Sequence, residues 1–448
     1  MSDYNYDVII LGAGPGGYET ALKCRRHDLS VCLIEKDQVG GTCLNRGCIP
    51  TKALLYGSEK LTELGNLEVL GITVDGYRFD YSKLAAYKDS VVGKLRGNVE
   101  MMLKKSGVSV VKGFGRLKDS HTVTVNDEDM TADNIILATG SSPFIPPIKG
   151  IENAISSDQF LTLESLDDDN WVIVGGGVIG MEIAFVLGQL GKQVTVLEMM
   201  PSILPGVDAS ILKWLNRSIK KLGIKVITSA RVEQIDSNSV SYTYKDKLET
   251  KEFDRCLVAT GRKNNIDGIG LEEAGIIRER NRIPVDEHLR TNVENIYAIG
   301  DITGIKQLAH VATYQGNVAL MNILGKKTAA DYSVVPSCIF VTPTISTVGL
   351  SEKELTEKGI VFSTVSYNVG ANGKALLSQK GEGTVIIYYS PENGEILGCQ
   401  MIADGSSEMI NELSLAIKNK LGIREIATLI HPHPTVGEIV KEACEKGC

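Results

Sequence analysis

Two cysteines, Cys43 and Cys48, stand five residues apart in the segment GGTCLNRGCIPTK (40–52) and could form and break a disulfide. In a regular helix, residues five apart are turned by about 140° and separated by about 7.5 Å along the axis, too far for a disulfide. Gly47 can supply the backbone distortion that closes the pair. Pro50 suits the first turn of a helix, so we expect Cys48 at that helix's positive end, where the pKa of a thiol falls. Two buried structural thiols are the alternative.

Two glycine-rich turns, each between an apolar strand and a helix, predict dinucleotide sites. The first glycine of such a turn permits the bend, the second lets a pyrophosphate approach, and the third lets helix and strand pack. The helix N-terminus offers amide donors to the phosphates, and an acid after the next strand can accept from a ribose hydroxyl. The two sets are Gly12, Gly14, Gly17 with Glu35, and Gly175, Gly177, Gly180 with Glu198. An ordinary strand–turn–helix is the alternative reading of each set.

The residues after the second turn indicate which nucleotide it prefers. Glu198 can accept from a ribose 2′-hydroxyl but would repel a 2′-phosphate. Met199 and Met200 follow it, with no arginine nearby to neutralise a phosphate. The second site is therefore expected to bind NAD rather than NADP.

The elements that must position these residues form a duplicated strand–turn–helix–strand pattern, which predicts an α/β fold with two Rossmann-like dinucleotide-binding domains. Two short strands followed by Ala-Thr-Gly also recur, ending at Gly140 and at Gly261. The Pro/Gly-rich run 141–150 looks like a crossover, and TNVENIYAIGD returns to complete the first domain. Mixed strands and helices follow and indicate an α+β dimerisation domain. The expected domains are 1–145 completed by 265–330, 146–264, and 331–448.

Composition excludes several functions. At 448 residues the chain is too long for one core, and its net charge of −8 argues against nucleic acid or an anionic membrane as a partner. No apolar run is long enough to span a membrane, and the first residues lack a signal-peptide pattern, so we expect a cytoplasmic protein. Nine cysteines and six histidines show no zinc-type spacing, so we expect no metal site and no structural disulfide framework.

Several motifs together resemble a known family. GGTCLNRGCIPTK, the two glycine turns, TNVENIYAIGD and the terminal HPHPTVGE occur in the order typical of the pyridine nucleotide–disulfide oxidoreductases, and within them are most similar to dihydrolipoamide dehydrogenases. The resemblance runs from residue 6 to about 443. It implies FAD in the first site, with Glu35 on its ribose and Asp301 near its ribityl and pyrophosphate, and NAD in the second. It also places Thr139 and Gly140 at the FAD and Gly261 at the NAD or near the flavin.

The resemblance further implies the groups that act on a dithiol. His433 would be the base and Glu438 the acid that orients it, although Thr435-Val-Gly-Glu438 is also a good capping box for the following helix. Lys52 and Glu182 match an ion pair beside the flavin, with two unrelated solvated charges as the alternative. Cys43 would exchange with the substrate while Cys48 lies nearer the flavin. His431 reads as a structural or surface residue.

The resemblance implies a homodimer in which the C-terminal domain closes the partner's active site. It also implies oxidation of dihydrolipoamide on the lipoyl domains of a 2-oxo acid, acetoin or glycine multienzyme system, with NAD as acceptor.

Two features depart from the family pattern. LAHVATYQG (308–316) has Gln315 where relatives commonly have an acid, which predicts altered flavin contacts. The chain ends in CEKGC, whose Cys444 and Cys448 we expect within the last helix as incidental thiols.

Three alternatives stay open. One is a thioredoxin- or mercuric-type reductase that uses Cys444 and Cys448, and another is a glutathione-type reductase. The third is a flavoprotein that serves mainly as a docking or sensing subunit.

Overall fold

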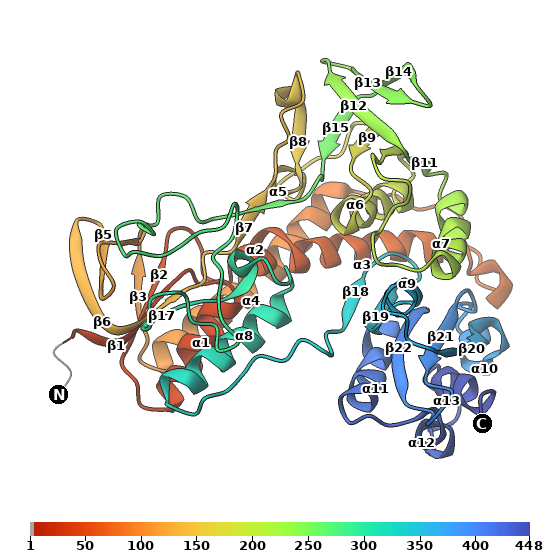
Figure 1. Ribbon diagram of the computed structural model, residues 1–448. Helices are drawn as coiled ribbons and strands as arrows, with labels where there is room; N and C mark the ends of the chain where they lie inside the picture. The colour runs from red at the N-terminus through yellow and green to blue at the C-terminus, as the bar shows by residue number, and fades with distance from the viewer. Residues whose placement is uncertain (1–3) are drawn as a thin grey trace.

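The apolar strand before the first glycine turn, β1 (Tyr6–Leu11), lies near the centre of a seven-stranded sheet in a computed structural model that describes residues 4–448 (Figure 1). It pairs in parallel with β2 (Val31–Glu35) and β6 (Glu128–Leu137). A strand between two parallel neighbours is covered on both faces, which explains its unbroken apolar run. The other strands of the sheet are β3 (Ser109–Lys112), β4 (Arg116–Leu117), β5 (Thr122–Val125) and β17 (Ile296–Ala298).

Helices from distant parts of the chain cover this first sheet. The helix that follows the glycine turn, α1 (Pro15–Arg26), packs against α8 (Ala309–Ile323). A side chain on Gly316 would overlap the Thr20 hydroxyl, so the glycine lets the two helices approach. The long helix α4 (Tyr81–Lys105) also belongs to this lobe. Because β17 pairs with β6, the segment after the second lobe is part of the first lobe's sheet.

The second glycine turn lies in a separate five-stranded parallel sheet with the order β11-β10-β9-β15-β8. The helix after that turn, α6 (Val178–Gln189), is almost entirely buried because it lies between this sheet and the first lobe. A two-stranded ribbon of β7 (Ser141–Pro143) and β16 (Arg262–Asn264) links the two lobes. The remaining elements are β8 (Ala154–Ser156), β9 (Asn170–Val174), β10 (Gln193–Leu197), β11 (Lys225–Ile227), β15 (Arg255–Val258), the antiparallel β12 (Ala230–Ile235), β13 (Ser239–Tyr244) and β14 (Lys247–Glu252), α5 (Ser157–Phe160) and α7 (Ala209–Lys221).

The C-terminal lobe is an antiparallel sheet with the order β18-β19-β22-β21-β20, covered by short helices. Its strands are β18 (Ser337–Ile339), β19 (Ile345–Gly349), β20 (Ser363–Asn368), β21 (Thr384–Tyr389) and β22 (Ile396–Ile402). Its helices are α9 (Glu352–Glu357), α10 (Gly373–Leu377), α11 (Ser406–Lys418), α12 (Ile423–Thr428) and α13 (Glu438–Glu445). Single 3₁₀ turns occur along the chain at Glu68–Leu70, Ile151–Asn153, Gly300–Thr303 and Val369–Ala371. Two lobes built on parallel strands, the first with the antiparallel strands β4 and β5 at its edge, and one α+β lobe form the mixed α/β fold that the sequence predicts.

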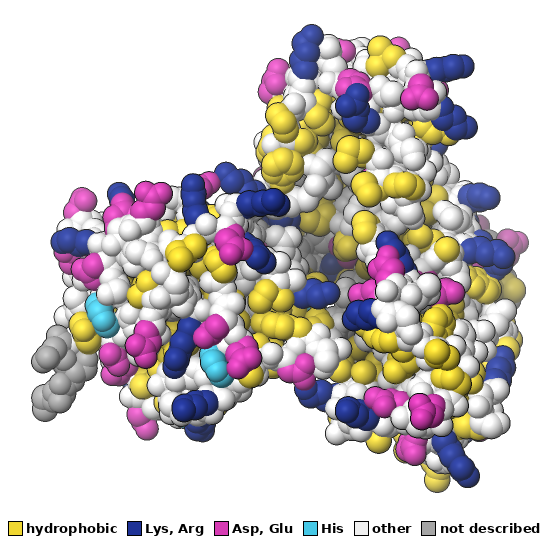
Figure 2. Space-filling view, viewed as in Figure 1, with side chains coloured by type: hydrophobic (Ala, Val, Ile, Leu, Met, Phe, Trp, Pro, Cys, Tyr) yellow, Lys and Arg dark blue, Asp and Glu magenta, His cyan; other side chains and the backbone are white. Residues whose placement is uncertain are grey.

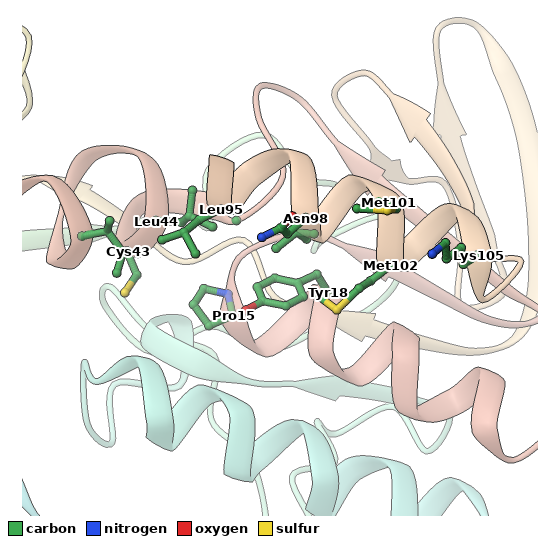
Figure 3. A pocket seen from close by; sticks show the side chains of 12 residues that line it. Pro15, Tyr18, Cys43, Leu44, Leu95, Asn98, Met101, Met102 and Lys105 are labelled. Atoms are coloured by element: carbon green, nitrogen blue, oxygen red, sulfur yellow. The ribbon is translucent and has the colours of Figure 1, made fainter. Parts of the chain in front are cut away.

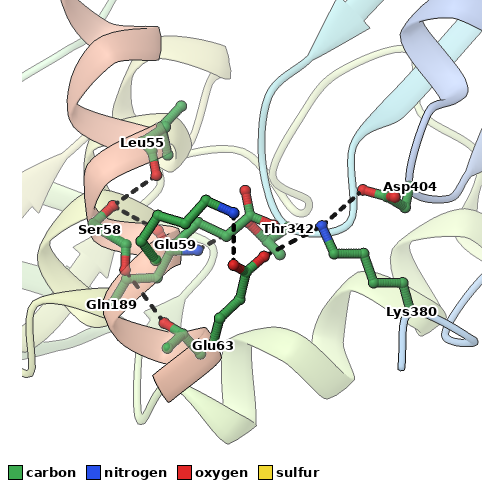
Figure 4. Close-up of polar contacts among 10 residues, drawn as sticks. Leu55, Ser58, Glu59, Glu63, Gln189, Thr342, Lys380 and Asp404 are labelled. Atoms are coloured by element: carbon green, nitrogen blue, oxygen red, sulfur yellow. Dashed lines mark hydrogen bonds and ion pairs between the residues drawn. The ribbon is translucent and has the colours of Figure 1, made fainter. Parts of the chain in front are cut away.

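One helix contacts all three lobes. The cysteine segment forms α2 (Gly41–Arg46) and α3 (Cys48–Leu64), and α3 runs between α6 and the C-terminal lobe (Figure 1). Ser58 on α3 donates to Gln189 at 2.7 Å, and Gln189 donates to Thr342 at 2.9 Å. Further along α3, Lys380 of the C-terminal lobe pairs with Glu59 and Glu63 at 3.2 and 3.5 Å and with Asp404 at 3.2 Å (Figure 4). Figure 2 shows the surface hollowed where the lobes meet.

No helix within residues 4–448 combines the length and the apolar character that crossing a membrane requires.

Candidate active site

The two cysteines lie on either side of a helix break. Cys43 lies in α2, and Cys48 is the first residue of α3. The break is at Gly47, where a side chain would come within 3.1 Å of the Thr42 carbonyl oxygen, so the chain packs closely at the residue that the spacing argument chose. Neither cysteine is in a disulfide in this structure, and the two thiols lie close enough for each to shift the pKa of the other.

The environment separates the acidities of the two thiols. The hydrogen bond from Cys43 lowers the pKa of Cys48 to about 7, and the Lys52 ammonium lowers it further, while burial and Glu182 oppose the shift. The same hydrogen bond, together with burial, raises the pKa of Cys43, which therefore keeps the shared proton. The start of α3 also stabilises a thiolate at Cys48. The pair is suited to thiol–disulfide exchange, because one sulfur is a thiolate near neutral pH.

Lys52 and Glu182 form the predicted ion pair between α3 and α6. The Lys52 ammonium lies 2.9 and 2.8 Å from the two carboxylate oxygens of Glu182 and 4.4 Å from the centre of the Phe340 ring. The Phe340 amide also donates to Glu182 at 3.0 Å. The Glu182 side chain is only 6% exposed, so its charge depends on these donors.

An apolar groove leads from Cys43 along the outside of the first lobe (Figure 3). It lies between α1 and α4 and has a volume of about 610 Å³. Tyr18 forms part of one wall, and burial and Glu19 raise its pKa to about 12, so it presents a neutral phenol beside the thiol. The lining residues are Pro15, Tyr18, Gly40, Cys43, Leu44, Ile49, Leu95, Asn98, Val99, Met101, Met102 and Lys105. Sequence reasoning missed the α4 members because no motif marks that helix.

The first glycine turn has the space that a pyrophosphate needs. Side chains on Gly12 or Gly17 would overlap backbone oxygens of Ala138 and Gly12, so these two glycines serve close packing. A side chain on Gly14 would meet only the Cα of Gly41, at 4.0 Å, so this position opens onto free space in front of α1. Glu35 accepts from the Ala13 amide at 2.7 Å, and burial raises its pKa. The turn therefore fits a dinucleotide phosphate at the start of α1.

The second turn repeats this geometry. Side chains on Gly175 and Gly180 would overlap the carbonyl oxygens of Ala259 and Gly175, whereas one on Gly177 would meet nothing within 4 Å. Glu198 lies across the turn and accepts from the Gly176 amide at 2.6 Å and from the Met200 amide at 2.7 Å. Each of its oxygens keeps a lone pair for a ribose hydroxyl. The residues present therefore fit a second dinucleotide.

The remaining nucleotide-site residues lie at the carboxyl ends of parallel strands, where α/β sheets bind ligands. Thr139 and Gly140 follow β6, and Gly261 follows β15. Thr139 donates to the Asn265 carbonyl at 2.7 Å.

The hydroxyl of Ser141 donates to the carboxylate of Asp301, and Arg262 donates to the Ser141 hydroxyl and carbonyl at 2.7 and 2.6 Å. Sequence reasoning missed Ser141 and Arg262, although both directly follow the repeated Ala-Thr-Gly motif.

His433 and Glu438 form a pair in the C-terminal lobe. The ring Nδ1 of His433 lies 2.9 Å from one carboxylate oxygen of Glu438, and the other oxygen accepts from the Thr435 amide at 2.9 Å. These bonds lower the pKa of Glu438, that from Thr435 most. The Glu438 carboxylate thus makes both contacts that the sequence suggested. It lies against the ring of His433, and it accepts from the Thr435 amide as the acid of a capping box does. Glu438 is, however, the first residue of α13 rather than its third, because Gly437 caps the helix.

The structure does not bring this pair to the cysteines of the same chain. The His433 side chain is 79% exposed, and within residues 4–448 no hydrogen bond or ion pair joins it to Cys43 or Cys48. His431 instead is largely buried and lies 3.2 Å from Glu412. Within the same residues, no group of three or more His, Cys, Asp or Glu side chains is placed to hold a metal ion.

The structure shows the contacts of Gln315 and the positions of the C-terminal cysteines, the two departures from the family pattern. Gln315 is fully buried, accepts from the Gly300 amide at 2.6 Å and donates to the Tyr332 hydroxyl at 2.8 Å, so it supports the backbone next to Asp301. The expectation that Cys444 and Cys448 share the last helix was wrong for Cys448, because α13 ends at Glu445. Cys444 is fully buried, and burial raises its pKa to about 12.

Two family matches together cover most of this chain. Residues 6–316 match the model of the family "Pyridine nucleotide-disulphide oxidoreductase". Residues 335–444 match the model of that family's dimerisation domain. The chain belongs to this family. It is thus a flavoprotein disulfide oxidoreductase that uses FAD and NAD, as the motifs predict. The dimerisation domain supports the expected homodimer.

Individual relatives agree with this family. The chain is 41% identical to the dihydrolipoyl dehydrogenase of Chlamydia pneumoniae over 98% of this chain and 96% of that protein. It is 38% identical to the dihydrolipoyl dehydrogenase of Staphylococcus aureus, with the same coverage.

Among solved structures, LpdA from Mycobacterium tuberculosis matches with a TM-score of 0.90 at 28% identity, covering 98% of this chain and 99% of that one. A copper complex of the HOCl-induced flavoprotein disulfide reductase RclA from Escherichia coli matches with a TM-score of 0.89 at 27% identity over the whole of both chains.

Proposed function

We propose that this enzyme oxidises dihydrolipoamide carried on a protein to lipoamide, with NAD as the electron acceptor. The observation that carries the proposal is the thiol pair at the helix break, in which Cys48 has its pKa lowered and Cys43 lies at one end of an apolar groove. A groove of this character suits the alkyl chain of a lipoyl group better than a charged peptide such as glutathione. The names of the bacterial relatives support the same substrate.

Each thiol has a distinct part in the proposed exchange. In the oxidised enzyme a substrate thiolate attacks the sulfur of Cys43, and Cys48 leaves as a thiolate stabilised by Lys52 and the start of α3. The second substrate thiolate then attacks the sulfur joined to Cys43, which closes the lipoyl ring and releases Cys43 as a thiolate. Protonation of Cys43 then gives the reduced pair, a Cys43 thiol beside the Cys48 thiolate. Two electrons have then passed from the substrate to the protein.

We propose that a second copy of the chain supplies the base. A substrate thiol must lose a proton before it attacks, and His433, oriented by Glu438, can take it. Because His433 is exposed and lies away from the cysteines of its own chain, it is available to the active site of a partner subunit. The dimerisation domain in which it lies supports this arrangement.

We assign FAD to the first glycine turn, with Gly12, Gly14, Gly17, Glu35, Thr139, Gly140 and Asp301, in a domain of residues 1–145 completed by 265–330. NAD is assigned to the second turn in residues 146–264, with Gly175, Gly177, Gly180, Glu198 and Gly261, and residues 331–448 form the dimerisation domain. When bound, FAD supplies the two-electron chemistry between the thiol pair and NAD. Lys52 and Glu182 lie between the cysteine helix and the NAD domain, where they hold fixed charges beside that transfer. The free thiols suit a reducing cytoplasm.

The C-terminal cysteines are poor candidates for a second relay. Cys444 is fully buried and its raised pKa keeps it a thiol at neutral pH, so it cannot exchange readily with Cys448 or with a substrate. This disfavours a thioredoxin- or mercuric-type mechanism that depends on the pair.

A substrate panel on the purified dimer tests the proposal. Dihydrolipoamide, glutathione disulfide, thioredoxin and Hg(II) are each assayed with NAD(H) and with NADP(H), and the expected result is turnover with dihydrolipoamide and NAD. A Cys48→Ser variant should lose that turnover. Rapid turnover of another disulfide with no dihydrolipoamide oxidation would refute the assignment, and no turnover at all would favour a docking or sensing subunit.

A further inference from the structure

The outer face of α4 carries a regular row of exposed residues beside the groove. Lysines recur every eleven residues, and eleven residues make almost exactly three helical turns, so they line up along one face. The intervening positions four and seven residues on fall on the same face. All members are exposed, and we call them the α4 row: Lys83, Tyr87, Ser90, Lys94, Asn98, Met101 and Lys105.

The α4 row contains no acid, although the chain as a whole has a net charge of −8. The two acids of α4, Asp89 and Glu100, are turned about 120–140° away from the row by the helical repeat. Asp89 is already paired with Lys88 at 2.9 Å. Within residues 4–448 no Asp or Glu lines the groove, and Glu19, next to the lining residue Tyr18, accepts from the Tyr18 hydroxyl at 3.4 Å. The row is therefore a basic strip on an acidic protein.

The row and the groove share residues. Asn98, Met101 and Lys105 belong to both, so the basic strip borders the channel that ends at Cys43 (Figure 3). From Leu95 to Lys105 the groove follows ten helix residues, a length of about 15 Å. A dithiol at the end of a lysine side chain extended by an acyl chain can reach along it while its carrier stays outside.

We propose that the α4 row is the docking face for an acidic carrier domain that presents the dithiol on such an arm. The inference rests on the proposed dihydrolipoyl oxidation and adds the charge of the partner. Opposite charges bring the carrier to the row and raise the association rate, and the apolar groove then receives the arm. The charge of the α4 row thus discriminates between carrier domains, whereas the groove receives the dithiol arm.

The test compares three substrates: free dihydrolipoamide, a peptide whose dihydrolipoyl-lysine is flanked by aspartates, and the same peptide with asparagines in their place. In the wild-type dimer, kcat/KM should be higher for the aspartate peptide than for the asparagine peptide by about 5-fold at low salt, and the difference should vanish near 0.5 M salt, where the Debye length is only roughly 4 Å. Lys94→Glu should remove the preference. Lys104→Glu is the matched control, because it makes the same charge change on an exposed lysine of α4 that lies off the row.

Three results would overturn the proposal: no preference for the aspartate peptide, equal effects of Lys94→Glu and Lys104→Glu, or dissociation of the Lys94→Glu dimer in light scattering. The last would mean that a second copy of the chain covers the row. Failure of the dihydrolipoyl assignment looks different, because free dihydrolipoamide, which carries no flanking charge, would then not be oxidised by any of the proteins.

Discussion

Replacing Lys52 by methionine should raise the pKa of Cys48 and move activity to higher pH. The wild-type value is about 7, against 9 for an ordinary thiol, and the hydrogen bond from Cys43 is the largest cause, followed among the favourable ones by Lys52. The whole lowering corresponds to ~2.7 kcal/mol, reduced to ~1–1.5 kcal/mol because Cys48 is solvent-exposed. Loss of Lys52 removes only its own part of this lowering, but it also leaves the charge of Glu182 unpaired near Cys48. We therefore expect the pKa of Cys48 to rise by roughly 1 unit.

The raised pKa should lower the turnover rate at neutral pH. A pKa lowered in the folded enzyme leaves the thiolate present above about pH 7, whereas in Lys52→Met it forms only near pH 8. At pH 7 the thiolate fraction should fall about 5-fold and turnover with it, and the two enzymes should converge above about pH 9. The measurement is the ultraviolet absorbance of the thiolate during a pH titration of the reduced enzyme, taken as a difference from the matching Cys48→Ser protein, beside the pH dependence of kcat.

Lys60→Met is the matched control on the same helix. Lys60 pairs with Glu63 and lies twelve residues beyond Cys48, about 18 Å along α3, where salt screens its charge. An unpaired, buried Glu182 would lower the free energy of unfolding by about 3 kcal/mol. The double variant Lys52→Met/Glu182→Met avoids this loss, and its Cys48 pKa should rise less than that of Lys52→Met. A Lys52→Met midpoint within about 0.2 unit of wild type would refute the role given to Lys52.

The remaining predictions concern the base, the C-terminal thiols and the second glycine turn. Glu438→Gln should keep the fold by circular dichroism but lower kcat with dihydrolipoamide by about 100-fold, since the histidine loses its charged partner; an unchanged kcat would restrict Glu438 to capping α13. Cys444→Ala with Cys448→Ser should lower the free energy of unfolding by about 1 kcal/mol through the buried Cys444 and leave turnover within about 2-fold, and a lost turnover would restore the relay. Gly180→Ala should destabilise the protein by about 2 kcal/mol in thermal unfolding, because its side chain overlaps the Gly175 carbonyl, whereas Gly177→Ala should leave stability alone and weaken NAD binding more than about 10-fold; equal effects of the two would contradict the packing described here.

Sequence predicts those parts of the fold that depend on residues close together in the chain. Gly12 and Gly175 must bend, Gly14 and Gly177 must leave room, and each reason acts within a few residues, so the turns and their strands could be read directly. Gly47 is similar, because the spacing of two cysteines already required a break near it.

What sequence could not supply are contacts between distant segments. Lys52 and Glu182 are 130 residues apart, and only the family resemblance suggested that they meet. Ser141 and Arg262 gain their meaning from the ribbon that joins two lobes, which no local pattern encodes. The groove wall on α4 was missed for another reason. No motif marks its residues, and they line a groove only because α1 packs beside α4.

The helix that begins at Cys48 depends on residues made late in synthesis. Its middle and far end are held through Thr342, Lys380 and Asp404, which all come from the last quarter of the chain. A nascent chain can therefore complete both glycine turns and still lack the contacts that hold the middle and far end of α3. The packing of the cysteine helix is therefore complete only once the C-terminal lobe has been made.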